Sequence, residues 1–224
     1  MSTEEQLSEI KGVESLKQFY ETNKQNINIA AIAAILLLAG VWYYYKQYKP
    51  SLEIEASDSL FMAERYYGED SLNLALNGDG INLGMIDIAD EYGSTKVGER
   101  ATYFAGRILL EQGKYNESLE YLEDASFDDE FLAAQIIALQ GDCYSELGEY
   151  EKAGDYYMKA ANKRSNELTT PRALAKAGEA YEEAGEFDDA LDAYLELQED
   201  FSTFTEETNI EAKIARVKAK QSAK

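Results

Sequence analysis

Hydrophobic and polar positions divide the chain into an apolar stretch near its start and a longer part with helical periodicity. Residues 25–45 carry no charged side chain, and from Ile29 onward they are apolar or aromatic apart from Gly40. A helix needs about 20 such residues to cross the hydrocarbon core of a bilayer. From Ser51 onward, the pattern predicts amphipathic helices arranged in hairpins. The pattern predicts a transmembrane helix over residues 25–46, followed by a helical domain.

Two other interpretations of the apolar stretch are less favoured. A buried core helix is also apolar, but the aromatic run that begins at Trp42 is typical of a membrane–water interface. A cleaved signal peptide begins with a positively charged segment, whereas residues 1–24 hold five glutamates against three lysines. No pattern of small residues for cleavage follows the apolar core. We therefore expect an uncleaved anchor.

The charges that flank the anchor do not decide its orientation. Equal numbers of basic residues lie close to the stretch on both sides: Lys11, Lys17 and Lys24 before it, and Lys46, Lys49 and Arg65 after it. A short leader and a long acidic C-terminal part favour an arrangement with the N-terminus in the cytoplasm.

Residues 1–24 form a short amphipathic leader. Its apolar residues fall at helical spacing: Val13, Leu16, Phe19 and Tyr20. This stripe either extends the membrane helix along the interface or provides a docking face for a membrane partner.

Three segments of the helical part align on pairs of glycines. The pairs are Gly106 and Gly113, Gly141 and Gly148, and Gly178 and Gly185, and the first glycines are 35 and 37 residues apart. The first glycine of a pair is expected to allow two helices to approach closely, and the second to end a helix in the left-handed conformation. Three further sets recur in register: Tyr115, Tyr150 and Phe187 open the second helix, Ser118, Ala153 and Ala190 lie at the crossing, and Leu122, Tyr157 and Tyr194 are expected to pack against the next hairpin.

This pattern resembles the tetratricopeptide repeat (TPR), whose period is about 34 residues. The resemblance implies three repeats over residues 97–204, with Thr170 as an N-cap before Pro171 in the third. Residues 51–96 are expected to form a degenerate first hairpin, with a helix over 52–67, a loop up to Gly80 and a second helix through Asp90. Residues 205–224 are expected to form a capping helix and a basic tail. The fold class is therefore all-α: one N-terminal transmembrane helix followed by a TPR-like α-solenoid of helical hairpins.

Composition excludes several function classes. The chain has 43 acidic and 21 basic residues, a formal net charge of −22, which phosphate backbones would repel. It has no histidine and a single cysteine, Cys143, so histidine-based catalysis, internal disulfides and cysteine-rich metal sites are ruled out. Residues 77–81 resemble a calcium loop, but Ala75 and Ile86 stand where carboxylates are needed. We expect no enzyme activity, no cofactor, no metal and no nucleic-acid partner.

The TPR resemblance implies a concave groove that binds extended or helical segments of other proteins. The groove-facing positions would be Arg100, Tyr103, Arg107, Leu110 and Glu111, then Gln135, Ala138, Asp142, Ser145 and Glu146, then Arg172, Ala175, Glu179, Glu182 and Glu183. They lack the lysine and asparagine clamp with which chaperone-binding TPR domains hold a C-terminal carboxylate. A mildly acidic groove with tyrosine and leucine patches favours basic or amphipathic segments.

The order of the parts resembles the YfgM-like family, the ancillary subunits of the bacterial Sec translocon. The resemblance lies in the leader over residues 12–24, in an anchor that ends at Trp42-Tyr43, and in residues 88–95 before the first repeat. It implies a single-pass protein of the bacterial inner membrane with a cytoplasmic N-terminus and a periplasmic repeat domain. Its partners would be Sec channel subunits, a membrane-tethered periplasmic chaperone and emerging polypeptides, with Phe19, Tyr20 and Trp42 available for contacts near the membrane.

Two alternatives remain open at this stage. One is a TPR scaffold for envelope assembly or cell-wall machinery that does not bind the translocon, and the other is a cytosolic adaptor. Two tripeptides, Asp58-Ser59-Leu60 and Asp70-Ser71-Leu72, resemble the acceptor used for O-glycosylation by some Gram-negative bacteria. If they are glycosylated, the domain lies outside the cytoplasm.

Overall fold

The structure, a computed structural model, describes residues 3–204 and 209–223. Every regular element in these ranges is a helix, so the all-α class is confirmed. The chain forms two compact units, residues 1–51 and 52–224, which are described separately.

The first unit is built on one long helix, α1 (Thr3–Tyr43), followed by a π-helical turn, η1 (Tyr44–Tyr48). This is the one helix in the described part of the chain that is long and apolar enough to cross a membrane. Its apolar side chains are exposed: Leu36 and Leu37 each have 66% of their surface accessible. A helix in the core of a soluble protein would bury such side chains.

The leader does not form a separate element. Because α1 begins at Thr3, the leader continues into the apolar stretch, as one of the two interpretations of the leader proposed. Val13, Phe19 and Tyr20 are exposed on this helix, while the side chain of Leu16 lies outside the described part.

The second unit begins with α2 (Lys49–Gly68), α3 (Leu72–Asn77) and α4 (Met85–Tyr92). Helix α3 corrects the prediction of a loop up to Gly80. Its Ala75 and Leu76 are buried in the core with residues of α2 and α4, and this burial outweighs the loop-forming composition around it. The loop after α3 is closed by Asp79, whose carboxylate accepts hydrogen bonds from the backbone of Ile81 and Asn82 and from the Tyr66 hydroxyl.

Helix α2 is joined to the start of the first repeat by a carboxylate. Glu53 accepts hydrogen bonds from the backbone nitrogens of Lys96 and Val97, both at 3.1 Å, in the first turn of α5. Thr95 caps the same helix by accepting from the nitrogen of Gly98 at 2.9 Å. These acceptors satisfy backbone donors that have no partner within the helix.

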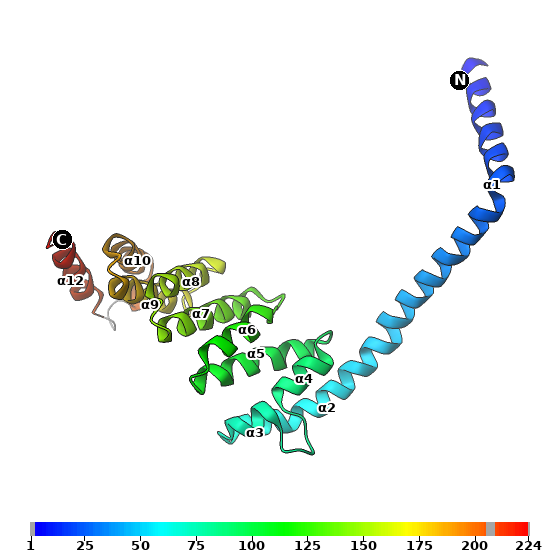
Figure 1. Cartoon of the computed structure of the whole chain (residues 1–224). Coiled ribbons are helices and arrows are strands. Elements are labelled where there is room, and N and C mark those ends of the chain that lie inside the picture. Colours follow the sequence, from blue (N-terminus) through cyan, green and yellow to red (C-terminus); the bar gives the residue numbers. More distant parts are fainter. Residues whose placement is uncertain (1–2, 205–208, 224) are drawn as a thin grey trace. The chain divides into compact units, whose positions relative to one another are not determined.

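Three helical hairpins follow, and their helices stack in chain order (Figure 1). The hairpins are α5 (Lys96–Glu111) with α6 (Tyr115–Asp124), α7 (Glu130–Glu146) with α8 (Tyr150–Lys163), and α9 (Thr170–Ala184) with α10 (Phe187–Asp200). Helix α12 (Ile210–Ser222) then packs on α10, with Ile210, Ile214 and Val217 buried. The expected start of this last helix, Thr205, lies outside the described residues.

Both glycines of each pair have the expected role. Gly113, Gly148 and Gly185 have φ angles of 76°, 78° and 82°, in the left-handed region where glycine ends a helix without strain. A Cβ at Gly106 would meet Leu122 at 2.8 Å, and a Cβ at Gly141 would meet the Tyr157 ring at 2.8 Å. Helix pairs therefore meet at the first glycine of each repeat.

Leu122, Tyr157 and Tyr194 each belong to a hydrophobic core that includes residues of the helices that follow, as expected. Each side chain covers the first glycine of its own repeat, because it lies on the face of the second helix that turns toward the first helix. Two lysines also lie over the tyrosine rings: Lys176 of the third repeat over Tyr157, and Lys213 of α12 over Tyr194.

One local expectation changes. Thr169, not Thr170, is the N-cap of α9, so Pro171 occupies the second helical position, and the Thr170 hydroxyl accepts from the nitrogen of Asn166 instead. Tyr150 opens α8 as expected, although 37% of its surface is exposed.

Cys143 is fully buried in the second repeat. Its Sγ donates to the Ser118 hydroxyl at 3.3 Å, and Ser118 donates to the carbonyl of Gly106 at 2.7 Å. Burial raises the pKa of the Cys143 thiol, so the thiol stays protonated and unreactive in the folded chain.

Replacing Gly141 with alanine is expected to destabilise the repeat domain by about 1–3 kcal/mol, because a Cβ would press on the Tyr157 ring. The free energy of unfolding in urea, measured on the detergent-solubilised full chain, tests this. Gly68→Ala is the matched control, since a Cβ at exposed Gly68 in α2 meets nothing within 4 Å. Equal stabilities of the two variants would contradict the role given to Gly141.

Candidate protein-binding groove

Two adjoining cavities lie along the face formed by the first helices of the repeats. The proximal cavity, about 410 Å³, is bounded mainly by α5, α7 and α9. Its lining residues are Tyr103, Arg107, Leu110, Glu111, Ala134, Gln135, Ala138, Leu139, Asp142, Ala160, Thr169, Arg172, Ala173 and Lys176.

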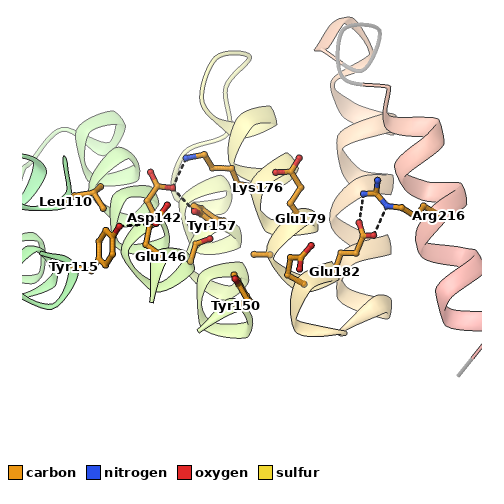
Figure 2. Close-up of a pocket in the computed structure, with 13 residues that line it drawn as sticks. Leu110, Tyr115, Asp142, Glu146, Tyr150, Tyr157, Lys176, Glu179, Glu182 and Arg216 are labelled. Atoms are coloured by element: carbon orange, nitrogen blue, oxygen red, sulfur yellow. Dashed lines mark hydrogen bonds and ion pairs between the residues drawn. The ribbon is translucent and has the colours of Figure 1, made fainter. Parts of the chain in front are cut away.

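The distal cavity, about 660 Å³, extends the same face toward α12 (Figure 2). Its lining residues are Leu110, Tyr115, Asp142, Ser145, Glu146, Tyr150, Tyr157, Lys176, Glu179, Ala180, Glu182, Glu183 and Arg216. Because Leu110, Asp142 and Lys176 line both cavities, the two cavities form one continuous groove.

A three-residue unit crosses from the second repeat to the third. Asp142 of α7 accepts hydrogen bonds from the Tyr157 hydroxyl of α8 and from Nζ of Lys176 in α9, both at 2.6 Å, as Figure 2 shows. Nζ of Lys176 also lies 5.4 Å from the centre of the Tyr157 ring. Burial, followed by the neighbouring charge of Asp142, raises the pKa of the Tyr157 hydroxyl.

The carboxylate–lysine pair recurs one repeat later but without the tyrosine hydrogen bond, because the buried Tyr194 hydroxyl has no partner among the described residues. Glu179 of α9 pairs with Lys213 of α12, and Nζ of Lys213 lies 5.7 Å from the centre of the Tyr194 ring. In both repeats the carboxylate directly follows the first glycine, and the lysine lies 34 residues further along the chain. We call this carboxylate, tyrosine and lysine a rung.

At the far end of the groove, Glu182 is held by two basic side chains of α12. Its oxygens accept from Nε and Nη2 of Arg216, both at 2.6 Å, and from Nζ of Lys220 at 2.8 Å. Only 5% of the Glu182 side chain is exposed, against 52% for Arg216 and 46% for Lys220. The hydrogen bonds from Arg216 lower the pKa of Glu182 more than burial raises it.

Most of the residues predicted from the sequence line this groove, including Tyr103, Arg107, Leu110 and Arg172 in the proximal cavity and Glu179 in the distal one. Asp142 lines both. The exceptions have other positions. Arg100 pairs with Glu64 of α2, and Ala175 lines neither cavity. Phe19, Tyr20 and Trp42 are exposed on α1, in the first unit.

Several of the lining residues were not assigned to the groove from the sequence, among them Lys176, Arg216, Tyr115, Tyr150 and Leu139. Tyr115 donates to Glu146 of the next repeat at 3.0 Å, although it was assigned only to its own hairpin. Lys176 could have been found from the sequence, because a lysine lies at the same distance after Asp142 and after Glu179. The groove is also not uniformly acidic, since the proximal cavity has three basic side chains and two carboxylates.

Comparison with known families identifies the hairpins. A family model for the tetratricopeptide repeat matches residues 99–126 and 134–162, and a second model for this repeat matches residues 172–203. The chain contains tetratricopeptide repeats. Each match coincides with one of the hairpins α5–α6, α7–α8 and α9–α10. Tetratricopeptide repeats indicate a scaffold for protein–protein interaction. No curated protein matches the chain.

Replacing Glu182 with glutamine is expected to reduce the free energy of unfolding by about 1 kcal/mol at neutral pH, by weakening the contact between α9 and α12. The pKa of Glu182 is lower in the folded chain than in the unfolded one. Its carboxylate therefore makes its full contribution to the free energy of unfolding at pH values above the ordinary carboxyl pKa. The contribution disappears as the pH falls below the ordinary carboxyl range and through the lower pKa of the folded chain. The loss of unfolding free energy caused by Glu182→Gln should therefore become smaller as the pH falls over this range.

Urea unfolding of the full chain at neutral and acidic pH measures this difference. Glu183→Gln is the control, because the neighbouring Glu183 is exposed and no ion pair to it occurs in the described residues. A loss in Glu182→Gln that did not change with pH would contradict the ionic role of this carboxylate.

Proposed function

We propose that this chain is a non-enzymatic membrane-anchored TPR scaffold, an accessory subunit of the bacterial Sec protein-translocation channel. The apolar helix α1 would cross the inner membrane, with the N-terminus in the cytoplasm and the repeats in the periplasm. The repeats would couple the channel to a membrane-tethered periplasmic chaperone or to emerging polypeptides.

The observation that carries this proposal is the continuous groove on the repeats. Its two cavities are open to solvent, and they combine apolar side chains such as Leu110 and Leu139 with charged groups of both signs. An emerging polypeptide presents the complementary features, since it is extended and exposes apolar and charged side chains together. TPR repeats use such surfaces to bind segments of other proteins.

The first unit supports the membrane part of the proposal. Helix α1 exposes an uncharged apolar stretch over residues 25–45, which water would disfavour and lipid would cover. Its aromatic end at Trp42 and Tyr43 fits a membrane–water interface. The likeness of the leader and anchor to YfgM-like proteins adds the Sec channel as the partner.

Affinity purification of the full chain from gently solubilised membranes is expected to recover Sec channel subunits together with a periplasmic chaperone. Lys176→Glu should reduce recovery of the partner bound in the groove by about fivefold, because it breaks the rung with Asp142 and changes the charge of both cavities. Lys163→Glu, an equal change of charge at the exposed end of α8, is the control.

Recovery of neither channel nor chaperone would overturn the Sec assignment. Recovery of cell-wall or outer-membrane assembly proteins in their place would support an envelope-assembly scaffold instead. Equal losses in Lys176→Glu and Lys163→Glu would mean that the groove is not the binding surface.

Orientation is tested with a membrane-impermeant thiol reagent on intact cells that express either Ser8→Cys or Ala223→Cys. Cys143 is buried and its thiol pKa is raised, so the native residue should stay unlabelled until the protein is unfolded. We expect labelling only at position 223. Labelling only at position 8 would place the repeats in the cytoplasm and favour a cytosolic adaptor.

A further inference from the structure

The interface between the first and second repeats lacks the rung that joins the later ones. By its place relative to the first glycines, Arg107 stands where Asp142 and Glu179 stand in the later repeats. Leu122 replaces the tyrosine, and Leu139 replaces the lysine. An arginine and two leucines cannot form the ion pair, and this interface has two leucines where the later ones have a tyrosine and a lysine.

The proximal cavity extends from this interface to α9. Leu110 and Leu139 supply apolar surface in it, together with three basic side chains, Arg107, Arg172 and Lys176. The cavity is therefore suited to a large apolar side chain next to a negatively charged one.

The two carboxylates of the proximal cavity are already engaged. Glu111 accepts from the Tyr67 hydroxyl at 2.9 Å and from Nε of Arg107 at 3.3 Å. Asp142 accepts from Tyr157 and Lys176 in the rung. In contrast, exposed Arg172 makes no ion pair with any residue that the structure describes. Its guanidinium is available to a carboxylate from a partner.

The distal cavity has the opposite character. It contains five carboxylates against two basic side chains, Lys176 and Arg216, and both of these are already paired. Exposed Glu183 forms no ion pair within the described residues. Tyr115 and Tyr150 line the same cavity and offer aromatic surface to the stem of a lysine or arginine.

We propose that the groove binds a charge-segregated segment of a partner protein, with acidic and large apolar residues in the proximal cavity and basic residues in the distal cavity. This inference rests on the proposed scaffold function and specifies its ligand. Because the two cavities adjoin through Leu110, Asp142 and Lys176, one short segment can occupy both. The order of charges along the groove then selects ligands by the arrangement of their residues as well as by their composition.

Two fluorescent peptides of identical composition test the proposal. One carries aspartate and phenylalanine in one half and lysine in the other half, and the second alternates the same residues. Fluorescence anisotropy with the detergent-solubilised full chain should show that the segregated peptide binds about tenfold more tightly, a difference of about 1.4 kcal/mol. Binding should weaken as salt is added.

Charge-reversal variants test which cavity binds which half of the segregated peptide. Arg172→Glu and Glu183→Lys should each remove most of the preference for the segregated peptide. Arg164→Glu and Glu199→Lys are the matched controls, because these exposed residues carry the same charges and line neither cavity. Both controls should retain the preference.

Equal affinities for the two peptides, or no binding of either, would overturn the proposed ligand. An equal effect of the control and cavity variants would do the same, because the preference would then reflect overall charge. The scaffold function is judged separately by the recovery of partners with Lys176→Glu, so it can stand when this inference fails.

Discussion

The close approach of two helices at a glycine is the constraint on which the repeat domain depends. Leu122 and Tyr157 cover Gly106 and Gly141, and no larger residue than glycine fits beneath them. Because each contact fixes one hairpin, the first helices of successive hairpins fall on a common face. Packing that is local to a repeat thus creates a surface that is shared between repeats.

In the second and third repeats the covering residue is a tyrosine, and in the second repeat it connects the core with the groove. The Tyr157 ring lies on Gly141, while its hydroxyl donates to Asp142, which also pairs with Lys176. In the first repeat the equivalent residue is Leu122. It covers Gly106 in the same way, but it has no hydroxyl to make this polar connection. At Tyr157, one residue therefore both holds its hairpin together and takes part in the polar contact with the next repeat.

The sequence was sufficient for features that are set within about ten residues. Left-handed glycines such as Gly148 and the aromatic that follows two residues later form a local signal, and the structure has the predicted turns. Helix α3 was missed because asparagine and glycine around it suggest a loop, and only tertiary burial of Leu76 stabilises so short a helix.

The groove was predictable only in part. The family pattern identified the groove-facing positions of each first helix, including Tyr103 and Asp142. Lys176 was missed because its partner is 34 residues away, and pairing over that distance depends on how one hairpin is rotated on the next. The charge difference between the two cavities was not predictable for the same reason. The sequence shows how many acidic residues there are, but the ion pairs that form in the fold determine which of them remain available to a partner.

The tyrosine hydroxyls on carboxylates have a consequence for the conditions under which the groove works. The chain has no histidine, and the pKa values of Tyr115 and Tyr157 are raised by the carboxylates that they contact and by burial. Because histidine is the side chain whose ordinary pKa lies near neutrality, its absence from the chain removes the usual cause of a change in the groove's charges between weakly acidic and weakly alkaline surroundings.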